Sequence, residues 1–448
     1  MTRSPQGAPG LRPSTAPVLE EPPLLSVRGL KVHFASKRGT VHAVDGVDLD
    51  IRDGETLGLV GETGSGKSVT ARSLLRLVPQ PPGIFAGGEA LFRPKIDCPA
   101  CRGVGCADCG GTGRVGSPCS ACSGSGCATC GGTGRETVDL LTVSERRMRT
   151  IRGNHISMIF QDPGKALNPA LPIREQLAEV FAEHRADEIL AEAGIDHAGA
   201  HPLLRRDAKL RSGFLERRLL SLPPLRSHHR RLQAVIDERV ARALADTRIP
   251  NPRKVMMRYP HELSGGMKQR VMIAQAIAAN PELLIADEPT TALDVTIQAR
   301  ILDLLSELQE RLHTAVLYIS HDLSLVRRIS DRVAVMYAGQ LDEIGRADEL
   351  FARPLHPYTR GLIGAVPAMH HARGGLVAID GTVPELIDPD PSCRFSGRCP
   401  HSAPVCQRLD PPLVPHGPER STACFLYEDA TALGVDPADM PHDAEIDR

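Results

Sequence analysis

The most informative stretch of this 448-residue chain is Gly61-Glu62-Thr63-Gly64-Ser65-Gly66-Lys67-Ser68. It follows an apolar run typical of a buried strand (56–60) and precedes a helical pattern (66–77). Glycines let backbone N–H groups turn inward around an anion, and the start of a helix adds partial positive charge. This pattern predicts a P-loop, in which Lys67 contacts the β- and γ-phosphates of a nucleotide and Ser68 binds Mg²⁺. A glycine-rich turn that matches by chance is the alternative.

A second apolar run, Leu283-Leu284-Ile285-Ala286, ends in the carboxylates Asp287 and Glu288. In P-loop proteins a carboxylate at the end of such a strand binds Mg²⁺, and a positioned carboxylate can polarise the attacking water. We therefore expect Asp287 beside the metal ion and Glu288 as the general base. Taken alone this pattern is common and mostly structural, so the assignment depends on the motifs around it.

The composition limits the class of protein. Hydrophobic residues make up 41% of the chain and charged residues 24%, which is typical of a globular protein. A net charge of −1 gives no overall attraction to nucleic acid or to an anionic membrane. No apolar run reaches the ~18–20 residues needed to cross a bilayer, and the Pro-rich first 22 residues contain no secretory h-region. We expect a cytoplasmic protein.

Strand and helix patterns alternate along the chain, which predicts an α/β fold with a largely parallel sheet. We expect a disordered tail over 1–22, a main domain over 23–345 and a separate Pro- and Cys-rich C-terminal region over 346–448. Two segments interrupt the main domain: a Cys-rich insertion over 93–137 and a helical subdomain over 161–265.

Further motifs carry a resemblance to a known family. Leu263-Ser264-Gly265-Gly266-Met267-Lys268-Gln269-Arg270 resembles the signature of ABC ATPases, and the stretch from Asp287 to Asp294 resembles their fused Walker B and D-loop. Gln161 matches the Q-loop and His321 the switch histidine. The chain resembles an ABC nucleotide-binding domain, which implies a P-loop NTPase with a RecA-like core, an antiparallel β subdomain and a helical subdomain.

The resemblance implies roles for these residues. Two subunits would pair head to tail, and Ser264, Gly265 and Gly266 of one would contact the γ-phosphate held by the P-loop of the other. His321 would also contact the γ-phosphate, while Gln161 would sense Mg²⁺ and touch a transmembrane partner. Phe34 is the candidate for stacking on adenine, with a place in the core as the alternative. An ATPase with Glu288, His321, Lys67 and Gln161 as catalytic residues is expected.

Several stretches resemble the ATPase subunits of oligopeptide/dipeptide importers, among them Tyr259-Pro260-His261-Glu262 and His356-Pro357-Tyr358-Thr359. This implies import of peptides or of a related solute such as a nickel chelate, from the cytoplasmic side of a membrane. Two permease subunits, a second ATPase (identical or only similar) and an extracytoplasmic binding protein would be the partners. The main rival is a nucleic-acid-associated ATPase of the excision-repair type, although such proteins carry two ABC modules and this chain has one.

Eight cysteines of the insertion form four Cys-x2-Cys-x-Gly-x-Gly units in an internal duplication. In a cytosolic chain this pattern favours two Cys₄ zinc sites over disulfides. The units resemble the zinc-binding region of J-domain co-chaperones, which implies that the outer units pair and the inner units pair; sequential pairing stays open. The outer set is Cys98, Cys101, Cys127 and Cys130, and the inner set is Cys106, Cys109, Cys119 and Cys122. A folding staple and a docking module are the two interpretations of the insertion.

Four more cysteines, Cys393, Cys399, Cys406 and Cys424, lie in the C-terminal region. This arrangement resembles the C-terminal region of the peptide importers, where four cysteines can hold a [4Fe–4S] cluster; zinc is the alternative. Elsewhere, residues 201–231 contain nine Lys or Arg against two acidic residues. A solvated helical face and a contact with anionic lipid headgroups are the two interpretations of this basic extension.

Overall fold

The computed structural model describes residues 22–97, 114–118, 123, 135–195, 201–210, 213–220, 222–223, 225–290, 294–365 and 379–442. All eight cysteines of the insertion, the predicted N-terminal tail up to residue 21 and residues 291–293 therefore lie outside the described residues.

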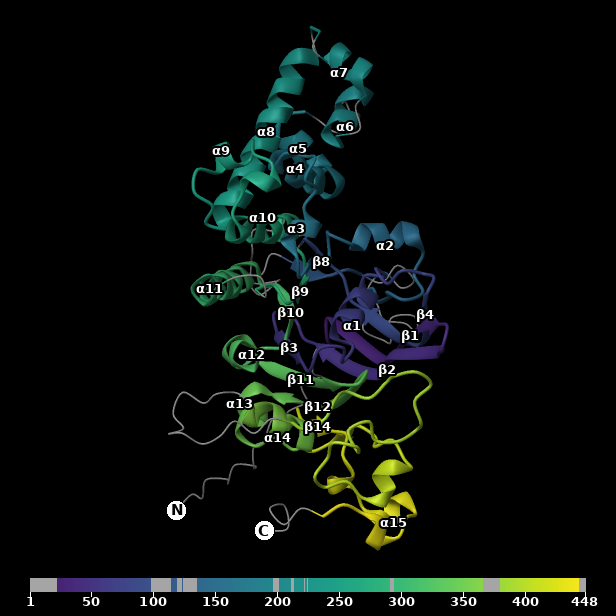
Figure 1. The fold of residues 1–448 in the computed structure, drawn as a ribbon. Coiled ribbons are helices and arrows are strands. Elements are labelled where there is room, and N and C mark those ends of the chain that lie inside the picture. Colours follow the sequence, from purple (N-terminus) through teal and green to yellow (C-terminus); the bar gives the residue numbers. More distant parts are fainter. Residues whose placement is uncertain are drawn as a thin grey trace, which may run out of the picture.

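An eight-stranded sheet occupies the middle of the molecule, in the order β13-β14-β12-β11-β3-β10-β9-β8 (Figure 1). Five consecutive strands, from β11 to the edge strand β8, run parallel, which confirms the predicted α/β class. They are β8 (Ile156–Ile159), β9 (Leu283–Asp287), β10 (Ala315–Ser320), β3 (Thr56–Val60) and β11 (Arg332–Tyr337). Alternate residues of these strands face opposite sides, so that Leu283 and Ile285 join one apolar core and Leu284 and Ala286 another.

The C-terminal region extends this sheet and is not a separate unit. Strand β12 (Gln340–Arg346) runs antiparallel to β11, and β14 (Ser421–Thr422) pairs with β12 and with β13 (Val414–Pro415). Between them lie α13 (Ala347–Ala352) and α14 (Pro357–Gly364), and α15 (Ala430–Leu433) follows. Short 3₁₀ turns occupy Pro404–Gln407, Phe425–Tyr427 and Pro437–Asp439. Pairing between strands so far apart leaves no local signal in the sequence. The region after residue 345, expected to be separate, therefore contributes strands to the main sheet.

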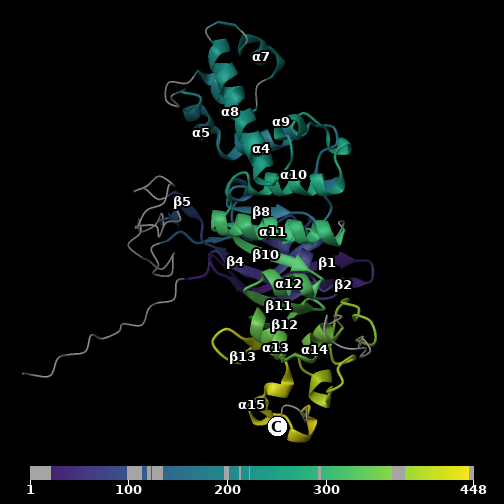
Figure 2. The same ribbon diagram turned by 90° about the vertical axis from the view of Figure 1, so that its left-hand side faces the viewer.

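A second, antiparallel sheet has the order β2-β1-β4-β7 and packs over the first core with α1 (Lys67–Leu74). Its strands are β1 (Leu25–Ser36), β2 (Gly39–Ile51), β4 (Gly83–Phe92) and β7 (Val138–Asp139). A two-stranded ribbon of β5 (Lys95–Asp97) and β6 (Arg114–Gly116) projects to one side (Figure 2). Helices α11 (Val295–Leu312) and α12 (Leu323–Ile329) contribute to the core on the other face of the main sheet.

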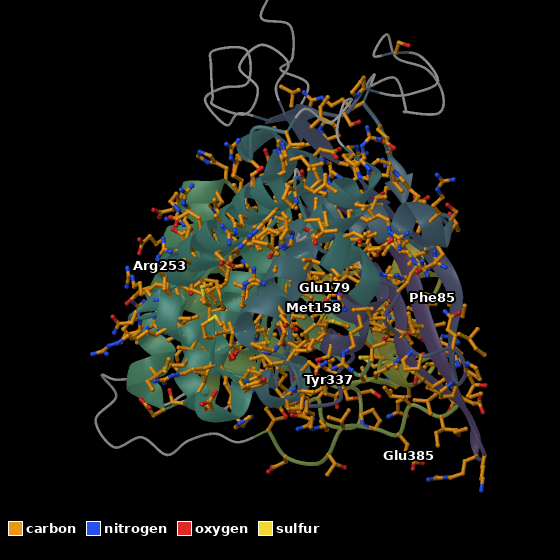
Figure 3. The ribbon with its side chains drawn as sticks, turned by 90° about the horizontal axis from the view of Figure 1, so that it is seen from above. Phe85, Met158, Glu179, Arg253, Tyr337 and Glu385 are labelled. Atoms are coloured by element: carbon orange, nitrogen blue, oxygen red, sulfur yellow. The ribbon has the colours of Figure 1, made fainter. Side chains whose placement is uncertain are left out.

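A helical arm stands at one end of the sheet and has its own apolar core (Figure 1). It contains α4 (Ile173–His184), α5 (Ala186–Glu192), α6 (Pro202–Ala208), α7 (Phe214–Leu220), α8 (Leu225–Asp246), α9 (Pro252–Val255) and α10 (Gly265–Ile277). Helices α2 (Glu145–Ile151) and α3 (Pro163–Ala166) and a 3₁₀ turn (Pro260–Glu262) complete the fold. Viewed from the arm, Arg253 and Phe85 lie on opposite sides of the molecule (Figure 3). Among the described residues, none of the helices combines the length and the hydropathy that a membrane span requires.

Candidate nucleotide and hydrolysis site

The P-loop connects β3 to α1, and its backbone requires glycine. Gly61, Gly64 and Gly66 have φ angles of 152°, 85° and 100°, a backbone conformation that residues other than glycine rarely adopt. A Cβ atom at Gly61 would lie 2.1 Å from the carbonyl oxygen of Met336, and one at Gly66 would lie 2.4 Å from that of Ala43. The loop is therefore held tightly against two neighbouring strands, with its N–H groups at the start of a helix.

Lys67 is buried inside this loop. Its ammonium group donates to the carbonyl oxygens of Gly61 and Glu62 at 2.7 and 2.8 Å and to the hydroxyl of Ser65 at 3.2 Å. Burial lowers the pKa of Lys67 to about 8, while the charges of Glu288, Asp287 and Glu62 oppose the shift. Phosphate oxygens are stronger acceptors than carbonyl groups, so Lys67 is placed to exchange these partners for a bound phosphate.

Ser68 and Asp287, predicted as Mg²⁺ ligands, meet directly. The Ser68 hydroxyl donates to Oδ1 of Asp287 at 2.7 Å, although the two residues are 219 positions apart. Oδ2 of Asp287 is buried without a hydrogen-bond partner, and burial raises the pKa of this carboxyl group. A divalent cation would satisfy this oxygen, whose nearest cation is Arg72 at 3.9 Å, so this pair fits Mg²⁺.

Three of the predicted catalytic side chains also converge. The amide of Gln161 donates to Oε2 of Glu288 at 2.8 Å, and Nδ1 of His321 lies 3.2 Å from Oε1 of the same carboxylate. Glu288 directly follows β9 with a φ of 47°, and its backbone N–H donates to the carbonyl oxygen of Ile319 on β10. A left-handed backbone at a non-glycine residue is uncommon and is concentrated at functional sites. Residues from the ends of three strands thus hold one carboxylate beside the P-loop.

The structure adds a contact that sequence reasoning missed. Both guanidinium nitrogens Nη1 and Nη2 of Arg398 contact the carboxylate of Glu62, at 2.9 and 3.1 Å. The backbone N–H of Glu62 donates to the hydroxyl of Tyr358 at 2.9 Å. The C-terminal region therefore holds the second residue of the P-loop, and no local pattern around Arg398 could have indicated this.

The signature residues lie apart from the P-loop, in the helical arm. Ser264 caps the N-terminus of α10, and its hydroxyl accepts from the N–H of Met267 at 3.4 Å; Gly265 and Gly266 form the first turn. Asp294, at the end of the predicted D-loop, likewise caps α11. Phe34 is partly buried against the core beneath the antiparallel sheet, so its stacking on adenine stays a prediction.

The four C-terminal cysteines gather in one place. Burial raises the pKa of Cys399 to about 11 and that of Cys424 to about 12, and the pKa of Cys393 is raised in the same way. Neighbouring thiols, Cys406 among them, add to each shift, while backbone N–H groups of residues 395, 401 and 426 hydrogen-bond to these three sulfurs and oppose it. All four are free thiols.

Four thiolates could hold either of the two groups considered, a zinc ion or an iron–sulfur cluster. One zinc ion binds four thiolates at about 2.3 Å, which places the sulfurs about 3.8 Å apart. Among the described residues, no three of these sulfurs lie within 4.8 Å of one another. Backbone N–H groups that hydrogen-bond to sulfur would stabilise thiolates at either kind of centre.

The sequence of this chain matches known families and relatives. The family model of ABC transporters matches residues 44–99 and 129–291, and that of the oligopeptide/dipeptide transporter C-terminal region matches residues 343–406. The chain is 36% identical over 405 residues to the dipeptide transport ATP-binding protein DppD of Bacillus subtilis, an alignment that covers 90% of this chain and 95% of that protein. It is 38% identical to the oligopeptide transport ATP-binding protein OppD of Salmonella typhimurium, covering 90% of this chain and 93% of that protein.

Proposed function

The chain belongs to the family of ATP-binding subunits of oligopeptide and dipeptide ABC transporters, and from this membership we propose that it hydrolyses ATP to drive the import of a peptide or a related solute. The relatives named above transport dipeptides and oligopeptides. A nickel chelate is the other solute class considered. The permease and the binding protein would select the solute, so this chain supplies the energy.

The observation that carries the ATPase assignment is the contact of Gln161 and His321 with the two oxygens of Glu288. These two contacts fix the orientation of the carboxylate at the end of β9. A carboxylate held in this way can accept a proton from water that attacks a phosphate, provided that it is ionised. A degenerate nucleotide-binding domain would not need to keep all three groups together.

The other residues bind and orient the nucleotide. Lys67 and the P-loop N–H groups hold the phosphates, and Ser68 and Asp287 hold Mg²⁺, which neutralises phosphate charge when bound. The site is completed by a second subunit, whose Ser264–Gly266 turn contributes N–H groups at a helix start. ATP then favours the closed pair of subunits, and hydrolysis with loss of phosphate reopens it. The permease follows this equilibrium.

Affinity purification of the tagged chain from membranes tests the transport assignment. We expect two permease subunits and a second ATPase, identical or similar, to co-purify, which would place the chain at the cytoplasmic side of the membrane. An extracytoplasmic binding protein should stimulate the ATPase of the reconstituted complex when its solute is present. Co-purification with nucleic acid instead, together with salt-dependent DNA binding, would support the excision-repair alternative and overturn the transport assignment.

At the C-terminal cysteines we propose a [4Fe–4S] cluster with a structural or sensing role. The gathering of the four thiols and the N–H donors at their sulfurs support it. Anaerobic purification should give a coloured protein with about four irons and four sulfides per chain, and Cys406→Ser should remove both. A colourless wild type whose zinc content falls by about one ion in Cys406→Ser would establish the zinc alternative.

For the Cys-rich insertion we propose two zinc sites that act as a folding staple. The repeated Cys-x2-Cys pattern supports this, as does the break in the family match between residues 99 and 129, which coincides with the repeats. Zinc analysis should find about two ions per chain in this segment. If the double variant of Cys98 and Cys127 releases one zinc ion, whereas the double variant of Cys98 and Cys106 releases two, the outer units pair. A full zinc content after all eight cysteines are replaced would exclude these sites.

The basic extension over 201–231 lies at the tip of the helical arm, on α6, α7 and the start of α8 (Figure 1). Part of its charge is neutralised internally, since Arg206 pairs with Glu216 at 3.0 Å. We therefore retain the interpretation of the basic extension as a solvated helical face. Sedimentation with vesicles that contain anionic lipids would reveal the membrane contact, which should weaken with salt.

A further inference from the structure

Two histidines and an aspartate meet on one face of the β1–β2 hairpin. His33 on β1 pairs across the strands with His42 on β2, and Lys31 pairs with Asp45. An irregularity in the register between Val32 and His33 inserts one extra residue into β2. Because strand side chains alternate, residues 42 and 45 would otherwise face opposite sides. The bulge brings both onto one face, and bulges commonly re-aim side chains in this way.

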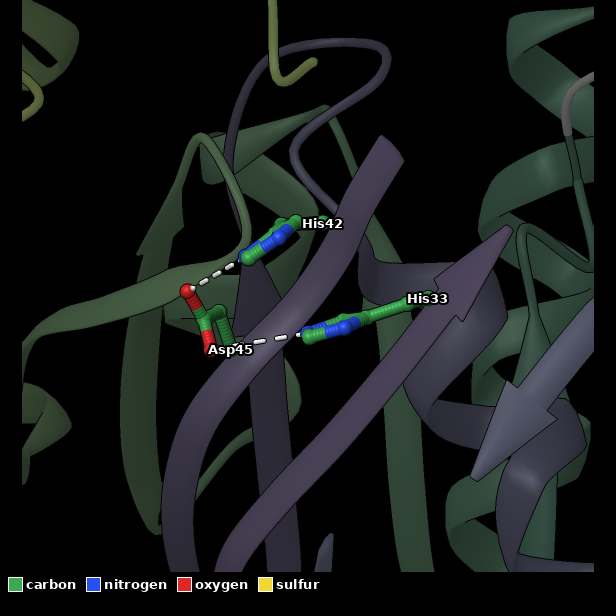
Figure 4. Close-up of side chains that lie close together, drawn as sticks. All are labelled: His33, His42 and Asp45. Carbon is green, nitrogen blue, oxygen red and sulfur yellow. Dashed lines mark hydrogen bonds and ion pairs between the residues drawn. The ribbon is translucent and has the colours of Figure 1, made fainter. Parts of the chain in front are cut away.

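The geometry of the three side chains is compact (Figure 4). The imidazole rings stack with centroids 3.9 Å apart and an interplanar angle of 19°, so that both present nitrogens toward Asp45. Nδ1 of His42 lies 3.1 Å from Oδ2 of Asp45, and Nε2 of His33 lies 3.6 Å from Oδ1. One ligand atom from each residue falls within 4.8 Å of the others.

Hydrogen bonding leaves this arrangement incomplete. A separation of 3.6 Å is too long for a hydrogen bond, and Nε2 of His33 is buried without a hydrogen-bond partner. Two ligands of one zinc ion, each bound at about 2.0–2.1 Å, stand about 3.3 Å apart, close to the distance observed between Nε2 and Oδ1.

The surrounding charges leave room for a cation. Arg394 donates to Oδ2 of Asp45 at 2.6 Å and leaves Oδ1 available. Lys31 lies 3.4 Å from Oδ1, but its side chain is 48% exposed and can turn into solvent. Asp45, Lys31 and Arg394 also line a cavity of about 280 Å³, from which water can complete the coordination.

We propose that His33, His42 and Asp45 form a binding site for a divalent transition-metal ion of the zinc class. Two imidazole nitrogens and one carboxylate oxygen are the ligands that such ions prefer, and calcium or magnesium would require more oxygens. The ion would link β1 to β2 next to Arg394, which directly follows Cys393 in the sequence. One of its ligands, His33, directly precedes Phe34. It is independent of the cysteine sites and does not rest on the proposed transport function.

Cadmium-113 NMR on the full-length protein tests this site, because the chemical shift distinguishes thiolate ligands from nitrogen and oxygen ligands. After the thiolate sites are filled, one further equivalent of cadmium should produce a resonance typical of nitrogen and oxygen ligands. His33→Gln and His42→Gln should each abolish this resonance and leave the thiolate resonances in place. His229→Gln is the matched control, since His229 pairs with Asp207 at 2.6 Å and no third ligand stands beside them in the described part of the chain; it should retain the resonance.

A second measurement needs no variant. Zinc should protect His42, the more exposed of the two histidines, from carbethoxylation by at least about tenfold in the wild type, as read by peptide mass spectrometry, and should leave His229 unprotected. The proposal is overturned if no nitrogen/oxygen resonance forms, if the resonance survives in both variants of the cluster, or if zinc changes the modification of His42 no more than that of His229.

Discussion

The contact between Arg398 and Glu62 supports a prediction about how strongly the C-terminal region holds the P-loop. Arg398→Met keeps most of the side-chain volume and removes the two-point contact with Glu62, together with weaker hydrogen bonds to the Tyr337 hydroxyl and to two backbone carbonyl groups. The Arg398 side chain is only 8% exposed and that of Glu62 is 27% exposed. Removing one partner of a fully buried pair costs about 3–5 kcal/mol, whereas exposed pairs contribute about 0–1 kcal/mol. Because Glu62 keeps partial access to water, we expect a loss of about 2–3 kcal/mol in the free energy of unfolding.

The chain contains a matched control for this experiment. Arg38 contacts Glu385 with the same two-point geometry, at 2.8 and 2.7 Å, and also joins the N-terminal hairpin to the C-terminal region. These side chains are 69% and 65% exposed, so Arg38→Met should cost under about 1 kcal/mol.

Urea unfolding followed by circular dichroism measures both variants, and a double-mutant cycle with Glu62→Gln isolates the coupling between the partners. We expect a coupling of at least about 1 kcal/mol for the buried pair. Equal losses for Arg398→Met and Arg38→Met, or strict additivity of Arg398→Met with Glu62→Gln, would refute the argument that burial decides the strength of this contact.

Three further predictions concern catalysis and pH. Glu288→Gln should bind ATP normally and lower kcat by about 10²–10⁴-fold in a phosphate-release assay; a loss under tenfold would contradict the role of general base. The pKa of Lys67 is about 8 among the loop oxygens, and bound phosphates raise it, so ATP binding at pH 8.5 should take up more than half a proton. Calorimetry in buffers of different ionisation enthalpy measures this uptake. Binding without proton uptake would contradict the prediction. Burial lowers the pKa of His356 to about 3 from the ordinary 6.5, so its contribution to stability is complete above pH 6.5 and falls by about 1.4 kcal/mol per pH unit below it. His356→Asn, which keeps a side-chain cap for α14, should flatten the fall in the urea midpoint between pH 6.5 and 5, and an unchanged slope would argue against this group.

The P-loop and the strand before it could be predicted because their signals are local. Gly61, Gly64 and Gly66 adopt backbone angles that other residues rarely reach, so the sequence carries the loop geometry directly. The run Leu283–Asp287 was likewise recognised as a buried strand because it is short and apolar on both faces. The order of these elements was sufficient for the fold class.

The boundaries of the strands were harder to predict from the sequence. Arg28 and Gly29 interrupt the apolar pattern of β1, yet the structure has one strand from Leu25 to Ser36 with register shifts. A bulge keeps a strand continuous while it disturbs the alternation on which a sequence prediction depends. The C-terminal strands were missed because each has only two residues and is stabilised by its partner in the sheet.

The identity of the nucleotide site follows from motifs in which each residue's chemistry is readable on its own: a lysine and a serine after a glycine loop, and two carboxylates at a strand end. Tertiary structure decided which of these groups touch and what holds them. Gln161 and Glu288 are 127 positions apart, and Glu62 and Arg398 are 336 apart. Contacts over such distances depend on how whole sheets and helices pack, and no local pattern of residues encodes them. The sequence alone thus identifies the chemical groups of the nucleotide site, whereas their contact with the C-terminal region arises only in the folded molecule.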